Sequence, residues 1–205
     1  MRRVAQKQFW HDAVTEKSFE FLQELRRSFD FVLIGGWAVY FYTKAMKSKD
    51  IDIIVEFHAL AELKKHFIVS KNEQLKKYEI KKGEFDIDIY VPHWSELGLP
   101  AEAILLNSRT IESFRVPQKE ALLAMKLFAY KERRTSLKGK KDFVDIVSIL
   151  YQGEKSIKKL RDFLEKYSVT ELWDGFIPIL RGTYAMEELG LNRKRFSDFK
   201  KQILS

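Results

Sequence analysis

Aspartate alternates with isoleucine in two short segments of this chain, residues 50–55 and 85–91. Successive side chains of a β-strand point to opposite faces of its sheet, so two aspartates that are two positions apart share a face. The alternation therefore predicts two strands whose isoleucines turn to the core and whose aspartates turn the other way. Only a fold that tolerates several carboxylates on one face of a sheet can accommodate both strands.

The apolar patterns before and after Pro117 differ in period. In the first part, short apolar or alternating runs predict strands at residues 31–34, 51–57, 75–82, 84–91 and 110–116. Helical spacing occurs between them at residues 12–28, 37–43, 59–67 and 101–106. In the second part the spacing is helical, at residues 120–130, 141–151, 156–167, 170–180 and 192–203. We therefore predict an α+β fold, with a mixed sheet flanked by helices in residues 1–117 and an all-helical region in residues 118–205.

Positive charge is concentrated in the second of these regions. Residues 1–117 carry 18 basic and 17 acidic side chains, whereas residues 118–205 carry 19 and 12. Eight lysines or arginines and two glutamates fall within residues 119–141. A field of this sign attracts polyanions such as nucleoside triphosphates or RNA, although a solvated helix face has the same composition.

Carboxylates on neighbouring strands repel one another, and burial penalises their charge further. A bound cation removes this cost, and oxygen ligands at this density suit Mg²⁺ or Mn²⁺ rather than Zn²⁺. Gly35 and Gly36 lie between a predicted strand and a predicted helix. Glycines in that place let the backbone approach a ligand closely and leave helix N–H groups directed at a phosphate. The alternative for a single aspartate pair is an edge strand kept soluble by its charges.

The order Gly-Gly, helix, S-x-D-x-D and a later strand carboxylate resembles the signature of the polymerase-beta-like nucleotidyltransferases, over about residues 31–91. In that family the glycine turn and the serine hold the triphosphate, and the first two aspartates bind two Mg²⁺ ions. The third aspartate serves one metal and the attacking hydroxyl. The matching positions here are Gly35, Gly36, Ser48, Asp50, Asp52 and Asp88. Asp88 is preferred to Asp86 because the family's third carboxylate usually opens an apolar strand end, as in DIYVP.

The segments ALLAMKLFAYKERR and GKKDFVDIVSIL are similar to the helical region of the AbiEii-type toxin nucleotidyltransferases and their prokaryotic relatives. In that group a helix lysine contacts the nucleotide, and a later K/R-D-x-x-D segment lines the cleft. The counterparts here are Lys126, Lys141, Asp142 and Asp145. The chain departs from the group at Met46, where an arginine is common, so Lys44 or Lys47 would have to replace that arginine.

These resemblances imply a metal-dependent nucleotidyltransferase that moves a nucleoside monophosphate from a nucleoside triphosphate to an acceptor hydroxyl of RNA, tRNA or protein. They imply a catalytic domain in residues 1–117, a helical domain completing the cleft in residues 118–205, and a toxin role with a cognate antitoxin protein. Two alternatives stay open, an inactive module of the same fold that binds RNA or a protein partner, and a small-molecule transferase of the antibiotic-modifying type. The chain has no cysteine and no apolar run of the roughly 18 residues that span a bilayer, so we expect a cytoplasmic protein without a membrane segment.

Overall fold

The computed structural model describes residues 12–152 and 157–204. The chain divides into two compact units, and within the described residues these are 12–122 and 123–204. They are called the N-terminal unit and the C-terminal unit below. The division falls inside helix α5 (Lys119–Arg133), just after the domain boundary expected from the sequence.

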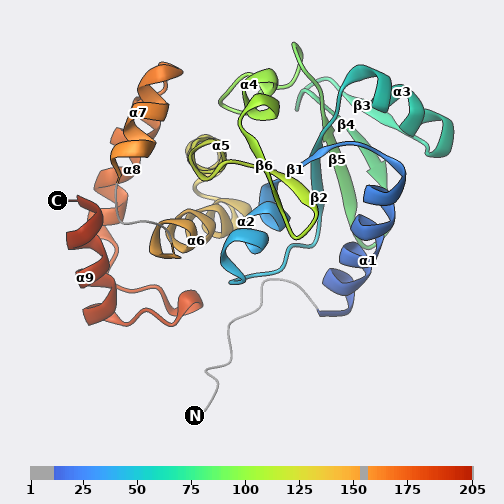
Figure 1. Ribbon diagram of the computed structural model, residues 1–205. Coiled ribbons are helices and arrows are strands. Elements are labelled where there is room, and N and C mark those ends of the chain that lie inside the picture. The colour runs from blue at the N-terminus through green and yellow to red at the C-terminus, as the bar shows by residue number, and fades with distance from the viewer. Residues whose placement is uncertain (1–11, 153–156, 205) are drawn as a thin grey trace. The chain divides into compact units, whose positions relative to one another are not determined.

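The N-terminal unit combines strands with helices, as the sequence predicts (Figure 1). Its strands are β1 (Val32–Ile34), β2 (Ile51–Ile54), β3 (Ser70–Asn72), β4 (Lys77–Lys81), β5 (Asp86–Tyr90), β6 (Ser108–Ile111) and β7 (Phe114–Pro117). Its helices are α1 (Asp12–Ser28), α2 (Gly35–Thr43), α3 (Phe57–His66) and α4 (Ala101–Leu106). The first five strands form one sheet in the order β1-β2-β5-β4-β3, and β6 pairs with β7 as a hairpin.

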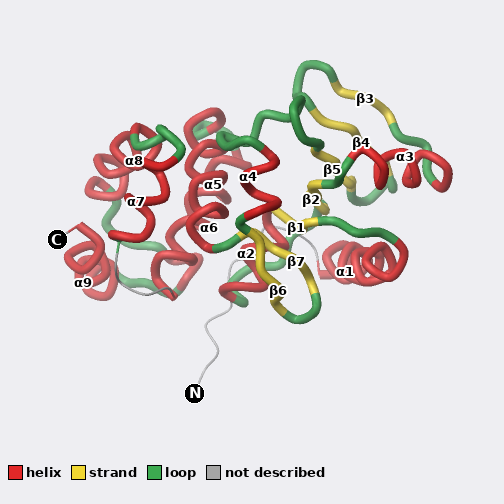
Figure 2. The backbone as a smooth tube through the Cα atoms, turned by 45° about the horizontal axis from the view of Figure 1, so that its top comes forward, coloured by secondary structure: helices red, strands yellow, loops and turns green. Residues whose placement is uncertain are grey.

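The five-stranded sheet is mixed, because β2 and β5 run parallel while the other neighbouring strands are antiparallel. The isoleucines of the two Asp/Ile segments form its central apolar layer, and Ile51, Ile53, Ile87 and Ile89 are each 0% exposed. Helices α1 and α3 lie on the same side of this sheet in both backbone views (Figures 1 and 2). The predicted core-facing isoleucines are therefore confirmed. Asp52, Asp86 and Asp88 occupy the alternate strand positions, whereas Asp50 precedes β2 and lies outside it.

Among the differences between the predicted and the observed elements, three concern strands. Strand β2 ends earlier than expected because β5, its partner, ends at Tyr90 shortly before Pro92, and α3 begins at Phe57. The single strand expected at residues 110–116 is the β6–β7 hairpin, whose turn residues Glu112 and Ser113 both have positive φ. Strand β3 was not predicted, since its Ser-Lys-Asn sequence has no apolar alternation and it forms the sheet edge.

The C-terminal unit is built from helices. After α5 these are α6 (Leu137–Gln152), α7 (Lys158–Lys166), α8 (Glu171–Gly182), the 3-10 helix η1 (Glu187–Leu189) and α9 (Arg193–Leu204). Beyond β7 the described residues contain one isolated β-bridge, between Met186 and Leu191, so the prediction of a helical C-terminal region is confirmed. Within residues 12–152 and 157–204, each helix is too short or too polar to cross a membrane.

Candidate active site

The glycine bend joins β1 to α2. Gly35 has φ of +65°, in the left-handed region that glycine adopts without steric cost. A Cβ atom placed on Gly35 would lie 2.1 Å from Oδ2 of Asp52 and 2.9 Å from its Cβ. The absence of a side chain at Gly35 therefore lets the Asp52 carboxylate rest against the backbone at the start of α2, which also contains Gly36.

An acidic row crosses three neighbouring strands of the sheet. Asp52 of β2 is in register with Asp88 of β5, and Asp88 is in register with Glu79 of β4. Residues paired in this way direct their side chains to the same face, with Cβ atoms close together. Asp88 lies in the middle of the row and is only 8% exposed, so its charge is both buried and next to a like charge.

A lysine that the sequence interpretation missed neutralises part of this row. Lys77 Nζ lies 2.6 Å from Oδ2 of Asp88 and 2.9 Å from Oε1 of Glu79. Burial and the charge of Asp52 raise the pKa of Asp88 to about 6, although Lys77 opposes this rise. The hydrogen bond and charge of Lys77 hold the pKa of Glu79 below its ordinary value. Burial alone would lower the pKa of Lys77, but the two carboxylates outweigh it and raise that pKa.

The signal for Lys77 and Glu79 was present in the sequence. Lys77, Glu79 and Lys81 alternate along one predicted strand, directly before the strand that carries Asp88. An antiparallel hairpin around Gly83 aligns these polar positions with those of its second strand. The sequence predicts strands on both sides of Gly83, but the alternation within each strand does not show which of their polar positions lie opposite one another.

Asp50 and Asp86 lie at the entrance of the two parallel strands. Asp50 directly precedes β2, and its Oδ1 accepts a hydrogen bond of 3.1 Å from the backbone N–H of Asp86. The Asp86 carboxylate pairs with Lys81 at 2.8 Å, and its side chain is 35% exposed. Asp88, by contrast, is buried beside Asp52. The choice of Asp88 over Asp86 as the third carboxylate stays a prediction.

The remaining predicted residues of the N-terminal unit lie between α2 and β2. Ser48 is buried at 6% exposure, two residues before Asp50. Met46 is also buried, at 8% exposure. The two lysines expected to replace an arginine there pair with glutamates, Lys44 with Glu112 at 2.6 Å and Lys47 with Glu16 at 3.9 Å. Triphosphate binding by Ser48 and either lysine stays a prediction.

The acidic row offers carboxylate oxygens, which are the ligands that hard divalent cations prefer. Among the described residues, no three His, Cys, Asp or Glu side chains form a ready group for a metal ion. Asp52 and Asp88 nevertheless supply carboxylates from adjacent strands, and Oδ1 of Asp88 is buried without a hydrogen-bond partner in the described part of the chain. Such an acceptor suits a hard cation. The oxygen chemistry of these two carboxylates suits Mg²⁺ or Mn²⁺, and a ligand role for Asp50, Asp52 or Asp88 stays a prediction.

Gly35→Ala is expected to lower the free energy of unfolding by about 2–3 kcal/mol, because left-handed backbone costs a non-glycine residue roughly 1–2 kcal/mol and the new Cβ displaces Asp52. Gly190→Ala is the matched control, since Gly190 has φ of +66° but no atom within 4 Å of its ideal Cβ. It should cost only the backbone strain. Urea denaturation of both variants measures the difference, and equal losses would contradict a tight Gly35–Asp52 contact.

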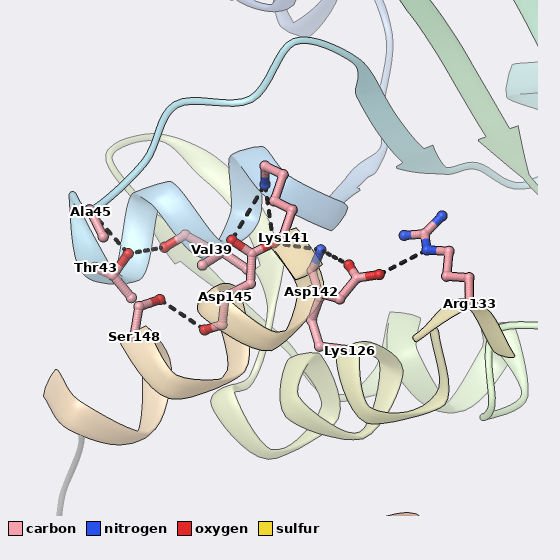
Figure 3. Close-up of polar contacts among 9 residues, drawn as sticks. All are labelled: Val39, Thr43, Ala45, Lys126, Arg133, Lys141, Asp142, Asp145 and Ser148. Atoms are coloured by element: carbon pink, nitrogen blue, oxygen red, sulfur yellow. Dashed lines mark hydrogen bonds and ion pairs between the residues drawn. The ribbon is translucent and has the colours of Figure 1, made fainter. Parts of the chain in front are cut away.

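The C-terminal unit contains a separate network of buried charges (Figure 3). Lys126 Nζ of α5 lies 3.0 Å from Oδ1 of Asp142 and 2.8 Å from Oδ2 of Asp145, both on α6. Arg133 Nε donates to Oδ2 of Asp142 at 2.8 Å, and Lys141 Nζ lies 3.1 Å from Oδ2 of Asp145. All but Arg133 are at least nine-tenths buried along their side chains.

This network favours the charged forms of Lys126 and Asp142. Burial alone would lower the pKa of Lys126, but Asp145 and Asp142 raise it above its ordinary value. Burial would raise the pKa of Asp142, but Lys126 and Arg133 bring it below the ordinary range. Lys126 and Asp142, both predicted to bind nucleotide, are thus engaged with each other, and nucleotide binding by either stays a prediction. Arg133 is a member that the sequence interpretation missed.

Comparison with protein-family models gave no match, and neither did comparison with curated proteins. Solved structures do match in fold. JHP933 from Helicobacter pylori aligns with a TM-score of 0.51 at 13% identity, over 95% of this chain and 91% of that chain. The antibiotic-resistance factor ANT(2'')-Ia, solved in solution, gives a TM-score of 0.50 at 15% identity, over 80% and 96%. Its crystal structure in complex with adenylyl-2''-tobramycin gives 0.50 at 14%, over 76% and 98%.

At these identities the similarity establishes the fold and leaves substrates undetermined. Together with the mixed sheet and the helical C-terminal region, it confirms the predicted nucleotidyltransferase-type α+β fold. The chain therefore shares the mixed α+β fold of these solved structures. The closer relation to the AbiEii-type group stays a prediction.

Proposed function

We propose that this chain is a metal-dependent nucleotidyltransferase, which transfers a nucleoside monophosphate from a nucleoside triphosphate to an acceptor hydroxyl. One observation carries the proposal. Asp52 lies beside Asp88 on parallel strands and also against the bare Cα of Gly35, at the start of a helix. An acidic pair next to a helix N-terminus can bind a triphosphate together with its cation, since the helix start favours phosphate and the acids favour the metal.

The chain's own residues have distinct roles in this mechanism. The N–H groups of the Gly35-Gly36 bend hold the phosphates, and Asp52, Asp88 and Asp50 would hold the cations. Bound Mg²⁺ or Mn²⁺ would neutralise charge on the phosphates and on the leaving pyrophosphate. The acceptor oxygen bonds to the α-phosphorus while the bond to the β-phosphate oxygen breaks. Asp88 takes the hydroxyl proton, because it would face the acceptor and a carboxylate within hydrogen-bond reach of a hydroxyl can act as a general base.

RNA is the acceptor class favoured by charge. Residues 118–205 carry 19 basic and 12 acidic side chains, which attracts a polyanion. A small hydroxyl compound is the second candidate, because ANT(2'')-Ia, a structure of similar fold, is complexed with adenylyl-2''-tobramycin. A toxin role with a cognate antitoxin protein, in the cytoplasm, belongs to the same proposal and depends on the resemblance of residues 121–134 and 139–150 to the AbiEii-type group.

Transfer can be tested with each α-labelled nucleoside triphosphate, Mg²⁺ and total tRNA. We expect label from at least one nucleotide to become attached to RNA, and EDTA to stop the reaction. Total tRNA whose terminal ribose has been oxidised with periodate is the matched control, because it keeps the charge and lacks the acceptor hydroxyls. A panel of aminoglycosides tests the small-molecule acceptor in parallel.

The inactive-module alternative predicts a different outcome. RNA would then bind without Mg²⁺, its affinity would fall steeply with salt, and no label would be transferred to any acceptor. That result would contradict the proposed activity.

A further inference from the structure

Lys77 is an internal cation placed among the acids of the sheet. Its ammonium bridges Asp88 Oδ2 at 2.6 Å and Glu79 Oε1 at 2.9 Å. The Lys77 and Asp88 side chains are each 11% exposed, and that of Glu79 is 13% exposed. Water therefore solvates these groups little, and the contact with Lys77 orients the Asp88 carboxylate.

The two oxygens of Asp88 are in different situations. Oδ2 is held by Lys77, whereas Oδ1 is buried without a hydrogen-bond partner among the described residues. A buried acceptor left without a partner is costly, so it points to a ligand. Asp52 is the register partner of Asp88 on the next strand. Oδ1, the oxygen without a partner, is therefore part of a carboxylate that lies on the same face of the sheet as the Asp52 side chain.

Stability alone does not explain a lysine at this position. Apolar residues that replace a buried ion pair are often neutral or stabilising, because the charges no longer have to leave water. Lys81, two positions along β4, gives a local comparison. It also pairs with an aspartate of β5, Asp86, at 2.8 Å, but its side chain is 59% exposed. Of these two ion pairs, the buried one, Lys77–Asp88, includes the predicted metal ligand Asp88.

We infer that Lys77 is a positioning residue for Asp88. It holds Oδ2, so that Oδ1 is presented toward the divalent cation in a fixed direction. Groups that hydrogen-bond to a ligating carboxylate orient it for the metal, and their loss typically weakens metal affinity 10–100-fold. This inference rests on the proposed function, because it takes Asp88 as a ligand.

The test is Mn²⁺ binding by the purified full chain without nucleotide, measured from the free-Mn²⁺ signal in electron paramagnetic resonance. Lys77→Met keeps the length of the side chain and removes its charge, and we expect Kd to rise about 10–100-fold. Lys77→Arg keeps a donor and should recover part of the affinity. Lys81→Met is the matched control on the same strand and should bind Mn²⁺ as the wild type does.

A second variant separates orientation from folding. Loss of Lys77 leaves buried Asp88 without its cation and leaves Glu79 only its 3.4 Å pair with exposed Lys81, so Lys77→Met can lose stability. Lys77→Met with Glu79→Gln removes one of those charges and still lacks the lysine on Asp88. It should be more stable than Lys77→Met and show the same rise in Kd. Circular dichroism at the temperature of the binding measurement verifies that each variant is folded.

The outcomes separate this inference from the proposed function. Mn²⁺ binding by the wild type with an unchanged Kd in both Lys77→Met variants would overturn the positioning role alone. Tighter binding would also overturn it, since Lys77 would then compete with the cation. A wild type that binds no Mn²⁺ in the millimolar range would overturn both the metal role and this inference.

Discussion

Asp88→Asn is expected to reduce the rate of nucleotide transfer by at least about 10³-fold while the chain stays folded. The variant loses a metal ligand and the general base together, and each loss raises the activation free energy by a few kcal/mol. Every 1.36 kcal/mol of activation free energy changes the rate about tenfold. The amide has the shape of the carboxylate and can still accept from Lys77, so the acidic row keeps its packing. Single-turnover transfer from labelled nucleotide measures the rate, and near- and far-ultraviolet circular dichroism verifies the fold.

The stability of the same variant should depend on pH. Asp88 ionises near its ordinary value of 3.8 in the unfolded chain but at about 6 in the folded chain, because burial and Asp52 raise its pKa. Between these values the folded chain binds more protons, so wild-type stability falls as pH rises through this window. The asparagine variant has no ionisable group at position 88, so its stability does not show this decrease. We expect the variant to be about 1–3 kcal/mol more stable than the wild type at about pH 8, and to lose this advantage below about pH 4.

Asp86→Asn is the control for both measurements. Asp86 lies on the same strand and pairs with a lysine, but its side chain is 35% exposed. It should keep transfer activity and change stability by no more than about 0.5 kcal/mol at either pH. If Asp88→Asn transfers nucleotide at the wild-type rate, the role of Asp88 is contradicted. If Asp86→Asn also loses transfer in that case, the third carboxylate is Asp86.

Lys126→Met should lower the free energy of unfolding by at least about 2 kcal/mol, because it removes the cation shared by two buried aspartates. A buried ion pair that loses one partner typically costs roughly 3–5 kcal/mol. The cost here is expected near the lower end, since Arg133 still pairs with Asp142 and Lys141 still pairs with Asp145. Urea denaturation at neutral pH measures it.

Lys131→Met is the matched control on the same helix, because Lys131 is exposed, and it should change stability by no more than about 0.5 kcal/mol. The pair also separates two roles for Lys126. If the lysine only holds the network, the KM for nucleotide should stay unchanged at temperatures where the variant is folded. A large rise in KM with little loss of stability would contradict the structural role and support nucleotide binding.

The site was predictable where it depends on alternation within one strand. The strand positions of Asp52 and Asp88 follow from the period of two, whereas Asp50, predicted to share a strand face with Asp52, precedes β2. Lys77 and Glu79 were missed because their meaning depends on cross-strand register, which aligns Glu79 with Asp88. Arg133 was missed because its partner lies on the following helix.

The sequence by itself determined the fold class, the isoleucine layer, the glycine bend and the positions of the acids, because each follows from local periodicity or from a backbone that glycine alone adopts readily. Tertiary structure decided which acids meet. Parallel pairing of β2 with β5 places Asp52 beside Asp88, and burial there raises the pKa of Asp88 to about 6. Register and desolvation depend on contacts between residues far apart in the chain, so no local pattern of residues can specify them.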